Sequence, residues 1–303
     1  EAGTAAGLVR ALEVHSESSE PACCDAACLA IANLGHRHRD NLKRLRDARA
    51  CEQVPRALRR QQDADGVGAA ESGLSALGVL AWLDDLKPDL REGCACEAIK
   101  DVLEWHGTSS ASVTERAAWA LQQLCFRDPQ CQARLGRVGA CPALVRGFEA
   151  HLADNPVTVA LVCDAVAKLV FDNPDNQTTL GDAGVCEAVV RGIRVHGATS
   201  AVCSDRACLA IANSCYSHTP NMNRLGQAGA CGAVAKAIAE HGQVNAGVAE
   251  WACTALFNLS HFPPNKRRLA LIKVDGLPLK HYVRHSACGH LRRKDNALSV
   301  LPD

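Results

Sequence analysis

The sequence predicts an all-α solenoid of about six stacked helical units with a period of 45 residues. The first observation is a cysteine that recurs at this spacing; its positions are Cys51, Cys96, Cys141, Cys186 and Cys231. The second is a set of apolar positions with helical spacing that recur with the same period. A unit of this length cannot bury its own apolar stripes, so neighbouring units must stack into one continuous core.

Each unit is expected to begin with a short helix. Its start is marked by a capping side chain followed by proline, at Asp128-Pro129, Asn173-Pro174 and Thr219-Pro220. Proline suits the first helical position, where no hydrogen-bond donor is needed. The recurring glycines Gly139, Gly184 and Gly229 should separate this helix from the next.

The second helix of each unit is predicted from an apolar column, with another four residues later. The first column holds Val54, Ile99, Leu144, Val189 and Val234, and the other holds Leu58, Leu103, Phe148, Ile193 and Ile238. This spacing is typical of the buried stripe of an amphipathic helix. We expect a His-Gly pair to close it, as at His106-Gly107, with the glycine in the left-handed conformation.

The third helix is predicted from a column of small residues: Ala30, Ser75, Ala120, Ala165, Ala210 and Ala255. We expect it to begin near an acidic residue, such as Glu115, Asp205 or Glu250, because a negative charge suits the start of a helix. Each unit is therefore read as a short helix, a helix and a longer helix.

We assign 1–303 to a single repeat domain, in which 1–19 are a partial N-terminal repeat, 20–289 are six repeats and 290–303 are a C-terminal tail. The partial repeat is inferred because 3–15 match 139–151, which belong to a second helix. The chain also begins with Glu rather than Met. Both features indicate a piece of a longer array or a processed chain.

Several stretches resemble the armadillo repeat over roughly residues 20–285. They are Trp119-Ala120-Leu121-Gln122-Gln123 with the following 134–140, and 254–259. The resemblance implies a right-handed superhelical α-solenoid that binds proteins and is not an enzyme. In that family, asparagines on the third helix hydrogen-bond the backbone of an extended peptide, and tryptophans four residues earlier line pockets for its side chains.

The matching positions here form what we call the third-helix column: Asn33, Gly78, Gln123, Lys168, Asn213 and Asn258. We expect Asn33, Trp119, Gln123, Lys168, Asn213 and Asn258 to line a concave groove that binds a partner segment, extended or helical. Lys168 would favour an acidic residue on the partner and speaks against capture of a basic peptide. The alternative is that the asparagines only cap helices or face water.

Two basic patches give a second hypothesis. One contains Arg37, Arg39, Lys43, Arg44 and Arg46, and the other contains Lys266, Arg267, Arg268, Arg292 and Arg293. Solvated helix faces explain most such runs, but these could also dock on an acidic surface. The chain would then be a structural subunit of a cytoskeletal, axonemal or other large assembly, held by its basic ends and convex face. Nucleic acid is the weaker candidate, because no aromatic residues are interleaved for base stacking.

The composition excludes several other classes of function. The 33 basic and 33 acidic residues balance, and no apolar run is long enough to span a membrane. No nucleophile elbow, phosphate loop or dinucleotide fingerprint is present, so no enzyme or cofactor is expected. The compact His285, Cys288 and His290 group is interpreted as surface residues, so no metal is expected.

The cysteines and histidines have structural interpretations. Nine of the 17 cysteines fall in two repeat columns, where cysteine substitutes for alanine as a small buried residue. So many free thiols indicate a reducing compartment, such as the cytoplasm, the nucleus or a cilium. The recurring His106, His151, His196 and His241 are expected to cap helix C-termini rather than form a catalytic row.

Overall fold

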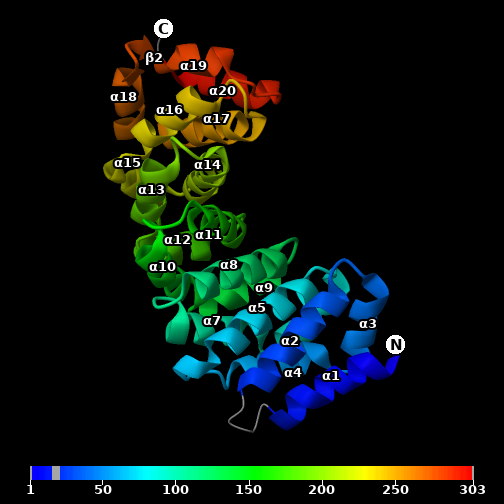
Figure 1. The fold of residues 1–303 in the computed structure, drawn as a ribbon. Coiled ribbons are helices and arrows are strands. Elements are labelled where there is room, and N and C mark those ends of the chain that lie inside the picture. The colour runs from blue at the N-terminus through cyan, green and yellow to red at the C-terminus, as the bar shows by residue number, and fades with distance from the viewer. Residues whose placement is uncertain (1, 16–20, 302–303) are drawn as a thin grey trace. The chain divides into compact units, whose positions relative to one another are not determined.

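A computed structural model describes residues 2–15 and 21–301 of the chain. Residues 1 and 16–19 of the expected partial repeat, residue 20 at the start of the six repeats, and 302–303 of the expected tail lie outside the described residues. The structure is an all-α solenoid in which the described residues form helices and one short hairpin (Figure 1). It divides into two compact units, Glu1–Ala150 (unit 1) and His151–Asp303 (unit 2).

Unit 1 begins with a second helix and a third helix and then continues through further repeats. Its α-helices are α1 (Ala2–His15), α2 (Pro21–Gly35), α3 (Arg39–Asp47), α4 (Ala50–Leu58), α5 (Val67–Ala81), α6 (Lys87–Glu92), α7 (Ala95–His106), α8 (Ala111–Cys125), α9 (Pro129–Arg137) and α10 (Ala140–His151), the last residue of which falls in unit 2. Two short 3-10 helices, Ala64–Gly66 and Asp84–Leu86, precede α5 and α6. The third helices α2, α5 and α8 pack side by side in this order.

Unit 2 continues the same pattern. Its helices are α11 (Pro156–Leu169), α12 (Pro174–Asp182), α13 (Val185–His196), α14 (Ala201–Cys215), α15 (Thr219–Ala228), α16 (Ala230–His241), α17 (Ala246–Ser260), α18 (Pro263–Leu271), α19 (Leu279–His285) and α20 (Leu291–Val300). Its third helices α11, α14, α17 and α20 pack in sequence. An antiparallel hairpin of β1 (Lys273–Val274) and β2 (Leu277–Pro278) separates α18 from α19.

The C-terminal residues differ from the expected tail. Residues 291–300 form α20, which begins 45 residues after α17 and packs against it. Its register shows that α20 is a shortened third helix, preceded by α18 as a first helix of the usual nine residues and by α19 as a shortened second helix. The assignment of 1–303 to one continuous domain stays a prediction.

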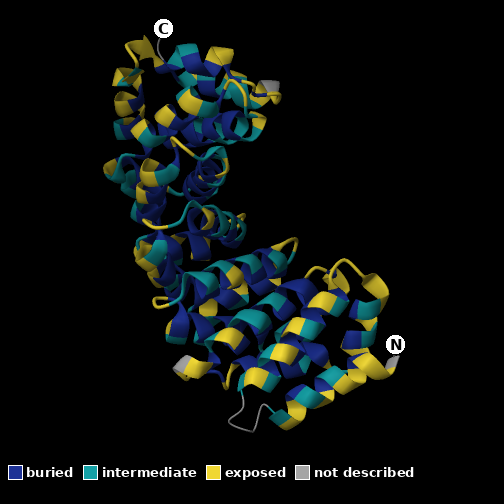
Figure 2. Cartoon of the chain, in the orientation of Figure 1, coloured by how far each residue is buried: buried dark blue, intermediate teal, exposed yellow. Residues whose placement is uncertain are grey.

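The core lies between the helix layers of each unit (Figure 2). The recurring cysteines are buried, and burial raises the pKa of the Cys51, Cys141 and Cys186 thiols to about 12. All 17 cysteines lie in the described residues, and none forms a disulfide. The prediction that cysteine acts here as a small buried residue is therefore confirmed.

The turns confirm part of the sequence prediction and correct the rest. Asp128 and Asn173 cap α9 and α12 through their side chains, but α15 is capped by His218 rather than Thr219. The glycines that close the second helices are right-handed, for example Gly107 at φ −59°. A Cβ at Gly107 would lie 2.5 Å from the Leu103 carbonyl oxygen, so close packing is what requires glycine there.

The left-handed conformation occurs one junction earlier in each repeat, between the first and second helices. Gly139, Gly184 and Gly229 have φ of 88°, 92° and 88°, and the same position holds Arg49 and Cys94 at 69° and 64°. The third helices also begin earlier than expected, at caps such as Ser110 and Asn245. The expected acidic residues therefore lie in the second turn of each helix rather than at its start.

The recurring histidines cap helix ends across the repeat boundary. The Nε2–H group of His106 donates to the Gln61 carbonyl at 2.6 Å, and that of His241 donates to the Gly197 carbonyl at 2.7 Å. Each acceptor lies just beyond a second helix of the preceding repeat, where carbonyls lack helical partners. The capping interpretation of these two histidines is confirmed, although the helix that each caps belongs to the neighbouring repeat.

Candidate functional site: the third-helix surface

The third-helix column has a different structure in each unit. In unit 1, the Trp119 indole lies directly on the backbone of Gly78 in the neighbouring helix. A Cβ built on Gly78 would be 2.2 Å from Trp119 Cζ3, so only glycine leaves room for the ring. Trp119 is half-buried by this contact. The indole therefore fills the space beside Gly78, a packing role that the sequence did not reveal.

The other two column members of unit 1 present free amides. Asn33 on α2 is exposed, and Gln123 on α8 is half-buried. Neither side chain hydrogen-bonds another described residue. An amide can donate and accept at once, which suits it to pair with a main-chain amide of a partner.

In unit 2, the column asparagines bind the chain itself. Asn213 Nδ2 donates to the Ala167 carbonyl at 3.1 Å, and Asn258 Nδ2 donates to the Ala212 carbonyl at 3.0 Å. Both acceptors lie in the last turn of the preceding third helix, where carbonyls lack an intrahelical partner. Asn258 is only 7% exposed. These amides thus connect neighbouring third helices by hydrogen bonds. This agrees with the alternative given above, in which the asparagines cap helices.

Lys168 completes the column in unit 2. It lies in the last turn of α11, is half-buried and has a partner within the chain. Its ammonium group lies near the negative end of the α11 dipole, a favourable position for a cation.

Three carboxylates share the third-helix surface of unit 2, and sequence reasoning missed them as a group. Asp164 lies on α11, Asp205 on α14 and Glu250 on α17. Arg206 lies 3.7 Å from Asp164 and 3.8 Å from Asp205, and Arg293 lies 3.3 Å from Glu250. Burial raises the pKa of Asp205. One oxygen each of Asp164 and Asp205 is buried without a hydrogen bond, and the two carboxylates share the single positive charge of Arg206.

Exposed aromatic side chains follow the third helices with the same period. Phe126, Phe171 and Tyr216 are spaced by 45 residues, each three residues after a column member. Phe171 and Tyr216 are each 63% exposed. In unit 1, Lys87 Nζ lies 5.6 Å and Arg127 Cζ 5.0 Å from the centre of the Phe126 ring. The 45-residue spacing could have revealed these aromatics in the sequence.

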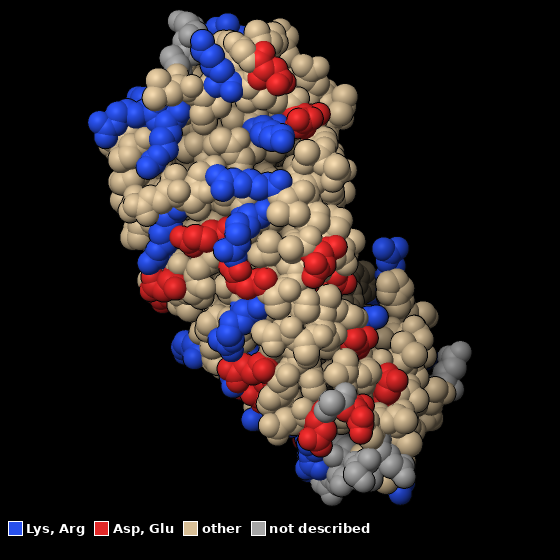
Figure 3. Space-filling view, turned by 60° about the vertical axis from the view of Figure 1, so that its left-hand side comes forward, with Lys and Arg blue, Asp and Glu red and all other residues tan. Residues whose placement is uncertain are grey.

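The basic patches are partly neutralised. In the first, Arg39 pairs with Asp85 and Arg46 with Asp47, while Arg37 and Lys43 have no partner among the described residues. In the second, Arg268 donates to Asn265 and Arg293 pairs with Glu250. Lys266, Arg267 and Arg292 have no partner in the described part of the chain. Figure 3 shows one face of the molecule, on which basic and acidic side chains are intermixed.

The described residues hold neither a metal-ligand cluster nor a membrane-spanning helix. Among residues 2–15 and 21–301, no three His, Cys, Asp or Glu side chains are grouped to hold a metal ion. No helix within these ranges has the length and apolarity to cross a bilayer.

Comparisons with solved structures place the chain in the armadillo-like repeat fold. An engineered protein matches 85% of this chain and 98% of its own, with a TM-score of 0.70 and 20% identity. A designed armadillo repeat protein matches 84% of this chain and 99% of its own, with a TM-score of 0.67 and 19% identity. Another, solved in complex with the peptide (KR)4, matches 84% of this chain and 98% of its own, with a TM-score of 0.65 and 20% identity. Comparisons with protein-family models and with curated proteins gave no match.

Proposed function

We propose that this protein is a non-enzymatic interaction scaffold whose third-helix surface binds an extended segment or a helix of a protein partner. The observation that carries the proposal is the regular 45-residue recurrence of polar column residues beside exposed aromatic residues. A surface that repeats along stacked helices suits a segment that also repeats its backbone groups. The designed armadillo protein bound to (KR)4 offers a precedent for peptide binding by this fold.

Each part of the proposed site has a distinct role. In unit 1, Asn33 and Gln123 would hydrogen-bond the partner's backbone. In unit 2, the half-buried Asn213 would do so with the amide oxygen and proton that remain after its Nδ2 binds the chain, whereas the buried Asn258 would hold the neighbouring helices in place. Phe171 and Tyr216 would supply apolar contacts at the rim. Trp119 would contribute the exposed part of its ring.

The charges on this surface predict a partner segment of mixed sign. Asp164 and Asp205, which share Arg206, would favour a cationic side chain, whereas Lys168 would favour an acidic one. A uniformly basic segment would therefore bind less well than one in which an acidic residue faces Lys168.

The proposal is tested by selecting peptides from a random library displayed against the immobilised full chain. We expect the selected sequences to share an acidic position, and the variant Lys168→Glu to select a basic residue there instead. Tyr216→Ala should weaken the selected peptides about tenfold, as expected for loss of one aromatic contact. Val244→Ala is a matched control, because Val244 is also highly exposed but lies before α17.

The outcome that would overturn the proposal is equally specific. If Asn213→Ala, Asn258→Ala and Tyr216→Ala all leave peptide affinity unchanged in folded protein, the third-helix surface is not the binding site. A selection that returns no consensus sequence would have the same meaning.

A second candidate function is that of a structural subunit in a large assembly. The unpartnered Lys266, Arg267 and Arg292 support it, because free cations at one end suit an acidic docking surface. Charge reversal at Lys266 and Arg267 should abolish salt-sensitive incorporation into such an assembly while leaving peptide selection unchanged. A reducing compartment such as the cytoplasm suits either function, because none of the 17 cysteines is in a disulfide.

A further inference from the structure

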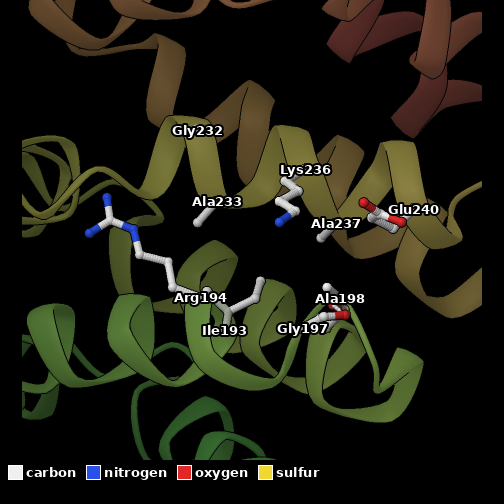
Figure 4. A pocket seen from close by; sticks show the side chains of 10 residues that line it. Ile193, Arg194, Gly197, Ala198, Gly232, Ala233, Lys236, Ala237 and Glu240 are labelled. Atoms are coloured by element: carbon white, nitrogen blue, oxygen red, sulfur yellow. Dashed lines mark hydrogen bonds between the residues drawn. The ribbon is translucent and has the colours of Figure 1, made fainter. Parts of the chain in front are cut away.

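A cleft opens in unit 2 between the second helices of two neighbouring repeats, α13 and α16. Its volume is about 180 Å³. Gly197, Ala198, Gly232, Ala233 and Ala237 supply much of its lining, and Arg194, Lys236 and Glu240 are the charged residues around it (Figure 4). The cleft therefore combines small residues with charged ones.

Gly232 is one reason that the cleft is open. In three other repeats the same position holds a glutamate: Glu52, Glu97 and Glu187. At Gly232 there is no side chain, and a Cβ placed there would meet nothing within 4 Å. The repeat that forms this cleft thus lacks the carboxylate that the preceding repeat carries at Glu187.

The charges across the cleft also break a pattern seen in unit 1. One position near the end of each second helix faces a position in the middle of the next second helix. Arg59 of α4 pairs with Asp101 of α7 at 2.8 Å, and Glu104 of α7 pairs with Arg146 of α10 at 3.5 Å. Opposite charges bridge both of these interfaces.

The same two positions in the cleft of unit 2 hold Arg194 and Lys236, so this interface carries two cations instead of a pair of opposite charges. Neither has a hydrogen-bond or ion-pair partner among the described residues. The Arg194 guanidinium extends along the backbone at Gly229, where a Cβ would lie only 2.1 Å from its Nη2. Figure 4 shows Lys236 between Arg194 and Glu240 along the cleft.

We propose that this cleft binds the carboxylate side chain of a glutamate on a protein partner. The carboxylate would lie between Arg194 and Lys236 and supply the negative charge that Asp101 or Glu104 supplies in unit 1. Ala233 and Ala237 would contact the methylene groups of the glutamate. The site lies on the second helices, so the proposal does not depend on the third-helix surface.

The net charge of the lining favours a carboxylate over a phosphate group. Arg194 and Lys236 contribute two positive charges and Glu240 one negative charge, which leaves a surplus of one positive charge. A carboxylate balances that surplus, whereas a phosphate monoester carries up to two negative charges near neutral pH and would face Glu240.

The test uses the full chain labelled at its alanine methyl groups, because three alanines line the cleft. The probes are N-acetylglutamate amide, the neutral isostere N-acetylglutamine amide, and N-acetylphosphoserine amide, each titrated while methyl NMR shifts are recorded. We expect saturable shifts at Ala198, Ala233 and Ala237 with the glutamate probe. We expect none with the glutamine probe and weaker binding of the phosphoserine probe.

Variants at the cleft and away from it separate specific binding from general attraction. Lys236→Glu should weaken the glutamate probe at least tenfold, and the neutral Lys236→Gln should weaken it by a smaller factor. Lys43→Glu is the matched control, because Lys43 is also exposed and unpartnered among the described residues and the charge change is the same. Its effect should stay within twofold.

Four results would overturn the proposal: shifts of equal size with the glutamine probe, tighter binding of the phosphoserine probe, equal weakening by Lys43→Glu, or no saturable shift at the three alanines. Intact methyl spectra for residues far from the cleft establish that each variant is folded. A negative result here leaves the third-helix proposal untouched, since peptide selection tests that surface separately.

Discussion

The residues of the third-helix column make different contacts in the two units. In unit 1, the Trp119 indole occupies the space beside Gly78, and Asn33 makes no bond within the described residues. In unit 2, Asn213 and Asn258 reach back to the preceding helix and donate to its terminal carbonyls. An equivalent sequence position therefore serves as a packing site in one unit and as a connection between repeats in the other.

The difference teaches that a column residue need not be reserved for a partner. A buried amide bonded to a free helix-end carbonyl stabilises the interface between repeats, whereas an exposed amide such as Asn33 contributes little to folding. Mutations along one column should therefore give effects on stability that differ from residue to residue.

The largest effect should come from filling the space that Trp119 occupies. Gly78→Val should lower the free energy of unfolding by about 3 kcal/mol, because over-packing a buried contact costs about 1–3 kcal/mol and the indole cannot move freely. Adding Trp119→Ala should recover part of this loss, since the obstruction is gone. Denaturant unfolding of both variants and of the pair measures the coupling.

Gly7→Val is the control, because Gly7 lies on α1 and an added Cβ there would meet nothing within 4 Å. It should change stability by less than about 0.5 kcal/mol, as expected for exposed surface sites. Equal losses for Gly7→Val and Gly78→Val would contradict the Trp119 contact.

An intermediate effect is expected at the column asparagines. Asn258→Ala should cost about 1–2 kcal/mol, because it removes a buried hydrogen bond and leaves the Ala212 carbonyl without that donor. Asn213→Ala should cost less, since Asn213 is only half-buried. Asn33→Ala should be nearly neutral. Chemical denaturation of the three variants gives the order of their stability losses. If Asn33→Ala lost as much stability as Asn258→Ala, the proposed difference between the two units would be contradicted.

The smallest effect on the free energy of unfolding is expected at Asp205, where the substitution should stabilise the protein rather than destabilise it. Burial raises the pKa of Asp205 in the folded protein, so the ionised carboxylate lowers stability once the pH exceeds its unfolded pKa of about 3.9. Asp205→Asn should therefore stabilise the protein at neutral pH by no more than about 1 kcal/mol. The gain should disappear as the pH falls below the unfolded pKa. A gain that persists at low pH would show that the charge is not its cause.

The repeat fold could be predicted from sequence because its signals are periodic. The cysteine, apolar and small-residue columns mark buried faces, and the proline and glycine positions mark turns. The role of Gly107 could not be predicted, because glycine is required there by close packing against the Leu103 carbonyl rather than by a left-handed turn. The α20 helix was missed because its sequence is polar and departs from the repeat pattern.

The candidate site was predicted only in outline. The period assigns Asn33, Asn213 and Asn258 to one column, but it does not say which of them bonds the neighbouring helix. Contacts such as Trp119 with Gly78 join positions 41 residues apart, so they depend on how adjacent repeats are rotated. The group formed by Asp164, Asp205 and Glu250 was missed for the same reason.

The most direct test of the central proposal is hydrogen exchange of the full chain with and without a library-selected peptide. The proposal predicts that bound peptide slows amide exchange in the third helices α11, α14 and α17 and leaves the second helices α13 and α16 unchanged, because a ligand stabilises the elements that it contacts. Slower exchange in α13 and α16 with no change in α11, α14 and α17 would contradict it.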